Sequence, residues 1–265
     1  MLTNTLIRSP QQAGLHQLYR RGDRGLQDLS LSRLHLDAGG VVDYRSDDEE
    51  SIIVLQQGRG TFLAGTESRR VSRRSVFDER ASSLYLPPGC SARISAETAM
   101  DAVLVSAPSR ESGTAAFSGP ADVQVNARGR GGYGREVHDI FVRDPHARRL
   151  MLGETFNPPG HWSSFPPHKH DGRDGEPRLE EIYYFRVNPP QGFGQQILYT
   201  TDGESVTHVV RDGDVVLLPY GYHPVAAAPG YQLYYLWAMV GDERKLALYE
   251  DPAHRWIHDA PAESV

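Results

Sequence analysis

The sequence predicts an all-β protein built from two similar units. Short segments that alternate apolar and polar residues recur along the chain, as in DLSLSRLHLD at positions 28–37. Alternation of this kind is typical of a strand with one buried face. Gly- and Pro-rich turns close these segments at short intervals, which favours a β-barrel or β-sandwich. At 265 residues the chain is long enough for two domains of ordinary size.

The first half opens with polar, turn-rich sequence as far as Gly25, in which Pro10 to Tyr19 is compatible with a short helical piece. GRG (58–60) and PPG (87–89) then supply turns between alternating segments. The expected strands of this half are 28–37, Ser51–Gln56, Thr61–Ala64, Ser83–Leu86, Cys90–Ala96 and Met100–Ser106.

Between the halves the composition shifts to Ser, Gly and Ala at 108–119, and ARGRGG (127–132) is a second turn-rich stretch. We therefore predict an N-terminal barrel with its linker at residues 1–126 and a C-terminal barrel at residues 127–265. The expected strands of the second half are Arg135–Val142, Leu150–Phe156, Ile182–Val187, Gln195–Thr200, Val206–Val210, Val215–Leu218 and Gln232–Val240.

The composition excludes several classes of protein. An apolar fraction of 39% and a charged fraction of 23% indicate a folded chain rather than a disordered one. The net charge of -6, without a basic block, argues against nucleic acid as a partner. We expect no membrane segment and no signal peptide, because no apolar run is long enough. The single Cys90 allows no internal disulfide and fits a cytoplasmic location.

The chemistry-bearing stretch of the sequence is PPHKHD at 166–171. On an extended strand His168 and His170 point to the same side, and two converging imidazoles are half of a metal site. An aromatic strand that opens with carboxylates follows at LEEIYYF (179–185), and His223 ends the turn in GDVVLLPYGYH (213–223). Three His and one Glu would leave room on a metal for water or substrate.

A faint internal repeat relates the two halves. The segment from Glu50 to Gly58 parallels the strand that begins at Glu181, and LPPG (86–89) parallels LPYG (218–221). The first half has no His-x-His before Glu50, and Cys90 and Ser91 follow its turn. We therefore expect the first barrel to lack metal ligands, to pack against the second barrel and to support homo-oligomer formation.

These motifs resemble those of the cupin superfamily, and an empty first barrel with a metal-bearing second barrel resembles a bicupin of two jelly rolls. The sequence departs from the general cupin pattern in two places. Ten residues separate His170 from Glu181, more than is usual, and His223 comes one residue early after the Pro-x-Gly turn. The insert DGRDGEPRLE must therefore loop out between strands.

The departures point to a narrower resemblance. PPHKHD, LEEIYYFRVNPPQGFG and DGDVVLLPYGYHPVAAAPGYQLYYLWAM are similar to the 5-deoxy-glucuronate isomerases of myo-inositol catabolism, which are related to the 5-keto-4-deoxyuronate isomerases of pectin breakdown. The similarity covers most of residues 136–256. It implies a small uronate substrate and an aldose–ketose isomerisation of 5-deoxy-D-glucuronate to 5-dehydro-2-deoxy-D-gluconate.

The resemblance also implies the ligand set, which is His168, His170, Glu181 and His223. Zinc is the metal expected first, with manganese or iron chemically acceptable. Glu180 would exchange with Glu181 if the strand carried a bulge. Glu181 is favoured because aromatic residues on its own face would line the barrel interior.

An isomerase of this kind must move a proton between adjacent carbons. A cation bound to the carbonyl and hydroxyl oxygens would stabilise the enediolate that forms. Glu181 and Tyr183 are the expected catalytic residues, while Glu180, Asp202 and Glu204 stay open as alternative bases. A metal-assisted hydride shift is the alternative route.

Three further residues are expected to contact the sugar. Arg186 is the candidate for its carboxylate, with Arg173 and Arg178 as alternatives. An amide at Gln196 would hold a hydroxyl, and Tyr222 would line the mouth. Alternative interpretations of the function are a cupin oxygenase, a non-catalytic sugar-binding cupin and an isomerase of the pectin-derived uronate.

Overall fold

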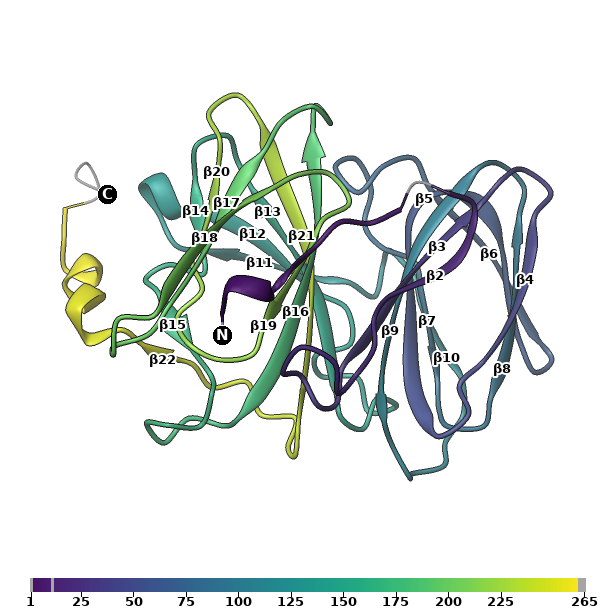
Figure 1. Ribbon diagram of the computed structural model, residues 1–265. Coiled ribbons are helices and arrows are strands. Elements are labelled where there is room, and N and C mark those ends of the chain that lie inside the picture. The colour runs from purple at the N-terminus through teal and green to yellow at the C-terminus, as the bar shows by residue number, and fades with distance from the viewer. Residues whose placement is uncertain (1, 11, 262–265) are drawn as a thin grey trace.

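The structure is a computed structural model that describes residues 2–10 and 12–261. Nearly all its regular elements are strands, as the sequence predicts, and they form two barrels that lie side by side (Figure 1). The short helices are the 3-10 turns η1 (Leu2–Asn4), η2 (Gly131–Tyr133) and η3 (Pro252–His258). No helix among the described residues is both long and apolar enough to cross a membrane.

The first barrel is a curled nine-stranded sheet. Its strands are β2 (Gly14–Tyr19), β3 (Ser30–Leu36), β4 (Val41–Arg45), β5 (Glu49–Ala64), β6 (Glu67–Arg73), β7 (Ser83–Leu86), β8 (Ser91–Ala96), β9 (Met100–Pro108) and β10 (Ala116–Ser118). Strand β5 pairs with β7 and β9 in its first part and with β6 and β8 in its second. Gly60 lies where β5 begins to pair with β8, and a Cβ at this position would collide with the Ser95 backbone.

The expected helical piece at residues 10–19 is wrong, since Gly14–Tyr19 forms β2 and pairs with β3. The first residues of β2 alternate between half-buried and exposed positions, so the period is that of a strand. The turn-rich composition around this segment had obscured the alternation.

The second barrel closes two sheets over one apolar interior. The larger sheet contains β1 (Leu6–Ile7), β11 (Gln124–Arg128), β12 (Arg135–Asp139), β13 (Leu150–Asn157), β16 (Leu179–Asn188), β19 (Val215–Leu218) and β21 (Gln232–Gly241). The smaller contains β14 (Trp162–Ser163), β17 (Gly194–Tyr199), β18 (Ser205–Val210) and β20 (Val225–Ala227). A separate pair is formed by β15 (His168–Lys169) and β22 (Tyr249–Glu250).

Strand pairing crosses the domain division that the sequence predicts. Strand β1 pairs with β19, so the N-terminal residues run to the second barrel (Figure 1). Leu2 is fully buried in the second barrel's apolar interior. Strand β11 spans the predicted boundary between residues 126 and 127 and pairs with β12. The boundary at residues 126 and 127 stays a prediction about independent folding. In the structure, β1 and β11 both belong to the larger sheet of the second barrel.

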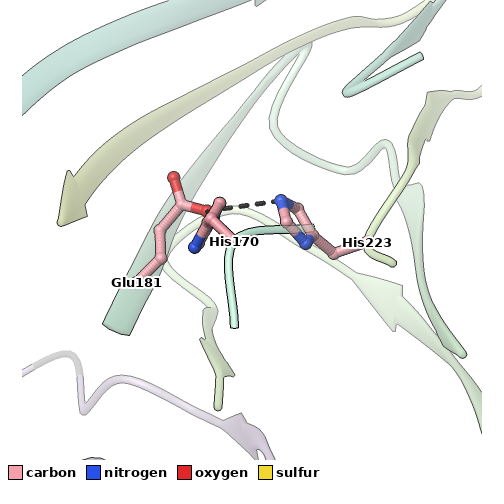
Figure 2. Close-up of side chains that lie close together, drawn as sticks. All are labelled: His170, Glu181 and His223. Atoms are coloured by element: carbon pink, nitrogen blue, oxygen red, sulfur yellow. Dashed lines mark hydrogen bonds and ion pairs between the residues drawn. The ribbon is translucent and has the colours of Figure 1, made fainter. Parts of the chain in front are cut away.

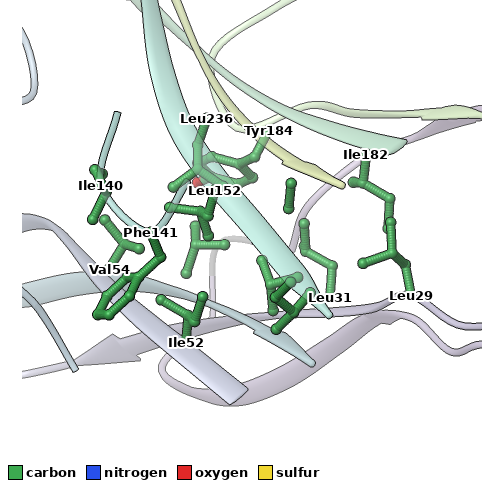
Figure 3. Packing of buried hydrophobic residues seen from close by; sticks show 14 of the residues in the cluster. Leu29, Leu31, Ile52, Val54, Ile140, Phe141, Leu152, Ile182, Tyr184 and Leu236 are labelled. Carbon is green, nitrogen blue, oxygen red and sulfur yellow. The ribbon is translucent and has the colours of Figure 1, made fainter. Parts of the chain in front are cut away.

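The two barrels share one continuous apolar core. Leu29, Leu31 and Ile52 of the first barrel pack against residues of the second, which include Ile182 and Tyr184 on one face of β16 (Figure 3). All five side chains are at most 2% exposed, so contact between the barrels removes a large apolar area from water. The barrels therefore pack against each other on the face of β16 that is opposite the second barrel's interior.

Two buried carboxylates join the barrels at equivalent positions. Glu50 accepts hydrogen bonds from the backbone N–H groups of Arg148, Arg149 and Leu150, at 2.6–2.8 Å. Glu180 accepts bonds from the N–H groups of Gln27 and Asp28 at 2.7 and 2.9 Å. Each carboxylate thus caps a loop of the other barrel, and charge-assisted bonds of this kind are strong.

This symmetry corrects the register of the internal repeat. Ser51 pairs with Leu86 as Glu181 pairs with Leu218. Glu50 therefore corresponds to Glu180, one residue away from the match with Glu181 that the sequence suggested. The position of the expected metal ligand is occupied by a serine in the first barrel, in agreement with the prediction that this barrel lacks the ligand set.

An ion pair is also buried between the barrels. Both nitrogens of the Arg73 fork bond to the Glu154 carboxylate at 2.7 and 2.9 Å, and neither side chain is exposed to solvent. Tyr234 donates to the same carboxylate at 2.8 Å, and Gln56 donates to the Tyr234 hydroxyl. The buried charges of Arg73 and Glu154 are compensated only while both side chains and the Tyr234 hydroxyl are present.

We predict that Arg73→Met lowers the free energy of unfolding by about 3–5 kcal/mol, because it leaves the Glu154 charge buried without its partner. Arg93→Met is the matched control, since Arg93 forms a similar forked pair with Asp43 in solvent. We expect the control to cost less than about 1 kcal/mol. Denaturant unfolding of both variants checks this, and equal losses would contradict it.

Candidate metal centre

Three side chains from separate segments meet inside the second barrel. The ligand atoms of His170, Glu181 and His223 lie within 4.8 Å of one another, and all three residues are buried (Figure 2). The Glu181 Oε2 atom is 3.0 Å from Nε2 of His170 and 3.4 Å from Nε2 of His223. A carboxylate between two imidazoles is a donor set that divalent metals accept.

The long insert brings His170 to Glu181 by folding back on itself. The Leu179 N–H donates to the His170 carbonyl at 2.8 Å, and Asp171 forms a β-bridge with Arg178. Lys169 points away from its two His neighbours and is buried among acidic side chains. Its Nζ lies 2.6–2.8 Å from carboxylate oxygens of Asp171, Asp174 and Glu176.

The turn that carries His223 requires a glycine. Gly221 has a φ of +85°, and a Cβ there would lie 2.6 Å from the Tyr199 carbonyl oxygen. Its N–H donates to the Asp171 carboxylate at 3.1 Å. The loop after β19 is therefore tied to the segment that follows His170, which holds two of the three clustered side chains in register.

The imidazoles are oriented with their Nε2 atoms toward Glu181. The His170 Nδ1 is 2.9 Å from the Leu179 carbonyl, and the His223 Nδ1 is 3.0 Å from the Gly221 carbonyl. Nδ1 is therefore the protonated nitrogen in each neutral ring, and Nε2 presents a lone pair. Nε2 of His223 and Oε1 of Glu181 are buried without a hydrogen-bond partner among the described residues. Such orphaned acceptors fit a bound cation.

His168 lies beside this group. Its ring centroid is 4.9 Å from that of His223, and it lines the same cavity as Glu181. Burial, with the charges of His170 and Arg135 nearby, lowers the pKa of His168 to about 3. Burial also lowers the pKa of His223 well below its ordinary value. Both rings are thus neutral at physiological pH, the form in which imidazole binds metals.

His170 and Glu181 behave as a pair. Burial disfavours the charged form of His170, but the hydrogen bond and charge of Glu181 outweigh it and raise the pKa of His170. Burial raises the pKa of Glu181, with His170 opposing the shift. His170 and Glu181 therefore share a proton when no cation is bound, and a bound cation would displace that proton.

A cavity of about 640 Å³ opens onto the cluster. Tyr183 lines it one strand period from Glu181, and its hydroxyl is 3.0 Å from the Ser164 hydroxyl. Its ring stacks on Tyr235 at 4.3 Å. Burial, with the Glu181 charge, raises the pKa of Tyr183 well above its ordinary value, so the phenol stays protonated. The aromatic lining expected on the Glu181 face is present.

The residues that the sequence suggested for sugar binding do not line this cavity. Arg186 is on the opposite face of β16 from Glu181 and pairs with Asp212 at 2.8 Å. Gln196 uses its amide nitrogen to donate to the His223 carbonyl at 2.8 Å, so it positions the His223 loop. Tyr222 is buried and stacks on Tyr199 with centroids 5.0 Å apart. Arg186 fails to reach the cavity because alternation along β16 turns it outward.

The alternative bases are occupied in other ways. Glu180 caps the first-barrel loop described above. Glu204 accepts from the Leu2 N–H and the Tyr220 hydroxyl, and Asp202 accepts from Thr200. The insert arginines are mostly exposed, at 59% for Arg173 and 68% for Arg178.

Strand β12 supplies cavity residues that sequence reasoning missed. Arg135, Val137 and Asp139 alternate on its inner face and all line the cavity. His138 of the same strand faces the other way and lies against Phe156 in a tilted arrangement, with ring centroids 4.6 Å apart. Alternation would have placed all three on one face had any of them been recognised as lining the interior.

Known proteins of similar sequence identify the family of this chain. The KduI/IolB family model matches residues 6–257. The chain belongs to this family. A 5-deoxy-glucuronate isomerase from Geobacillus kaustophilus (strain HTA426) is 38% identical over 232 residues, covering 85% of this chain and 84% of the relative. One from Bacillus subtilis (strain 168) is 38% identical, covering 84% and 85%. The family resemblance read from the sequence is confirmed.

Solved structures of similar shape support the fold. An IolB-like protein from Salmonella typhimurium LT2 has a TM-score of 0.90 at 33% identity, covering 97% of this chain and 100% of that chain. The oxalate decarboxylase of Lactobacillus farciminis has a TM-score of 0.69 at 13% identity, covering 99% and 90%. The latter likeness concerns the fold alone, and it confirms the expected all-β bicupin architecture of this KduI/IolB family member.

Two adjacent glutamates give a matched test of the centre. We predict that Glu181→Gln weakens metal affinity by more than about 100-fold, because it removes a ligand. Glu180→Gln should keep the metal and instead lower the melting temperature, because it weakens the bonds to Gln27 and Asp28. Metal analysis and thermal melts of both variants check this, and metal loss in Glu180→Gln alone would reverse the assignment.

Proposed function

We propose that this protein is a metal-dependent aldose–ketose isomerase that converts 5-deoxy-D-glucuronate to 5-dehydro-2-deoxy-D-gluconate. The observation that carries the proposal is the identity of 38% over 85% of the chain with a protein named 5-deoxy-glucuronate isomerase. The buried His and Glu cluster beside a cavity of sugar size is in keeping with it. A cytoplasmic location and a homo-oligomeric state remain predictions.

The group that completes the centre is a divalent cation, with zinc proposed first and manganese or iron as alternatives. His170, Glu181 and His223 would hold it, and His168, whose ring centroid is 4.9 Å from that of His223, is proposed as a fourth ligand. When bound, the cation supplies a Lewis acid for the carbonyl and hydroxyl oxygens of the sugar.

The chain's own groups carry the proton. The reaction removes a proton from the hydroxyl-bearing carbon and returns one to the neighbouring carbonyl carbon through an enediolate, while the hydroxyl proton passes to the former carbonyl oxygen, with no net oxidation. Glu181 Oε1 has no hydrogen-bond partner among the described residues, so it is available as the acceptor. The Tyr183 phenol, held protonated, donates to a sugar oxygen as charge develops there. Ser164 fixes its hydroxyl.

We predict that the purified protein isomerises 5-deoxy-D-glucuronate, and that chelation abolishes the activity while one divalent metal restores it. The assay follows both sugars by NMR under air and under nitrogen, with 5-keto-4-deoxyuronate as the competing substrate. Faster turnover of the competitor would move the assignment to the pectin-derived uronate. A requirement for oxygen would replace the isomerase with an oxygenase.

We predict that Tyr183→Phe lowers kcat by about 100-fold with little change in metal content, since it removes one preorganised donor. Tyr44→Phe is the control, because its hydroxyl bonds to Ser51 in the first barrel.

Incorporation of deuterium from heavy water into the product reports proton transfer. Product formed without any deuterium would favour the hydride route instead.

A further inference from the structure

The cavity contains two arginines that face each other across a strand pair. Arg135 on β12 and Arg128 on β11 are direct register partners, and both line the cavity. Like charges placed directly opposite each other on antiparallel strands are destabilising. A chain keeps such a pair at low cost only where an anion lies between the two charges or the charges are well solvated.

Arg135 is only partly solvated, whereas Arg128 is exposed. Arg135 is half-buried, and burial lowers the pKa of its guanidinium, with Arg128 adding to the effect. Its hydrogen bonds run from Nη1 alone to the carbonyls of Tyr133 and Phe165, at 3.3 and 3.2 Å. No carboxylate within the described part of the chain forms an ion pair with it, so Nε and Nη2 are left for another partner.

The neighbouring acids are committed elsewhere. Glu136 bonds to His138 at 2.6 Å, and Asp139 accepts a bond from Asn126 at 3.2 Å. Glu181 belongs to the ligand cluster. The cavity lining thus contains five Arg and Lys side chains against two acidic ones, and one of those two is the expected metal ligand. The cavity is therefore suited to an anionic ligand.

We propose that Arg135, assisted by Arg128, binds the carboxylate of the uronate substrate while the ligand cluster holds the other end of the sugar. A guanidinium fork with two free donor nitrogens matches a carboxylate. Arg135 also lies near His168, Tyr183 and Tyr235, which places it beside the cluster. This inference rests on the proposed function and assigns the carboxylate contact to Arg135 in place of Arg186, which does not line this cavity.

The test compares a charged substrate with a neutral one. Arg135→Met should lower kcat/KM for 5-deoxy-D-glucuronate by about 10- to 100-fold, mainly through KM. The ratio of kcat/KM for 5-deoxy-D-glucuronate to kcat/KM for neutral 5-deoxy-D-glucose should therefore fall in Arg135→Met. Arg135→Lys should recover part of the loss, and Arg128→Met should show a smaller loss. Arg173→Met, which removes an exposed arginine outside the cavity, is the control.

A binding readout separates this inference from the proposed function. By calorimetry, the wild-type protein should bind D-gluconate more tightly than D-sorbitol, and Arg135→Met should remove that preference. If the wild-type protein converts no uronate yet keeps an Arg135-dependent preference for gluconate, the function falls and the carboxylate site stands. If Arg135→Met does not fold, Arg135→Lys and Arg128→Met decide. Uronate KM and gluconate affinity within about twofold of wild type in the folded variants would overturn the inference.

Discussion

The structure depends on the alternation of side chains at the start of β16. Successive residues of a strand face opposite sides, so Glu180 and Glu181 are committed to different tasks by geometry alone. Glu180 reaches into the first barrel and caps two backbone N–H groups, whereas Glu181 turns into the second barrel between two imidazoles. One strand therefore fixes the barrel interface and the candidate metal centre together. A bulge at this point would exchange the two carboxylates and disrupt both.

The first barrel shows which of these two tasks the repeat retains. Glu50 occupies the Glu180 position and caps a loop of the second barrel, so the interfacial carboxylate is present in both halves. The Glu181 position is Ser51, whose hydroxyl bonds to Tyr44 inside its own barrel. A buried carboxylate without a cation or donors is costly, whereas a serine satisfied by a tyrosine is not. The first barrel thus keeps the residue that its packing needs and has no ligand at this position.

Much of the site could be predicted because it follows local rules. The spacing of His168 and His170 fixes their common direction, and the Pro-x-Gly turn fixes where His223 emerges. The aromatic face of β16 follows from the same alternation. The ligand cluster and the barrel lining were therefore accessible from single segments of sequence, helped by a family resemblance.

The parts that could not be predicted depend on pairing between distant strands. Arg186 seemed suited to a carboxylate, but its partner Asp212 lies on a separate loop and neutralises it. Arg135 was expected only as the first residue of a strand, because the register of β11 against β12 is needed to reveal that Arg128 faces it. The composition-based boundary also falls within β11, so sequence reasoning separated Gln124, Val125 and Asn126 from their partners on β12, although it left Arg128 and Arg135 in the same unit.

The distribution of charge in the second barrel gives a direction to any bound ligand. Imidazoles and one carboxylate gather at the cluster, while the guanidinium groups of Arg128 and Arg135, which form no ion pair within the described residues, lie on the β11–β12 side of the same cavity. A ligand with oxygens at one end and a carboxylate at the other meets complementary groups at both ends in only one orientation, since reversal would bring two carboxylates together near Glu181. The barrel contact is connected to both regions of the cavity. Glu180 bonds to the first barrel one residue before Glu181, and Glu50 accepts a bond from Leu150 at the start of β13, the strand that pairs with β12. The first barrel therefore supports the cavity walls, although it has no expected metal ligand of its own.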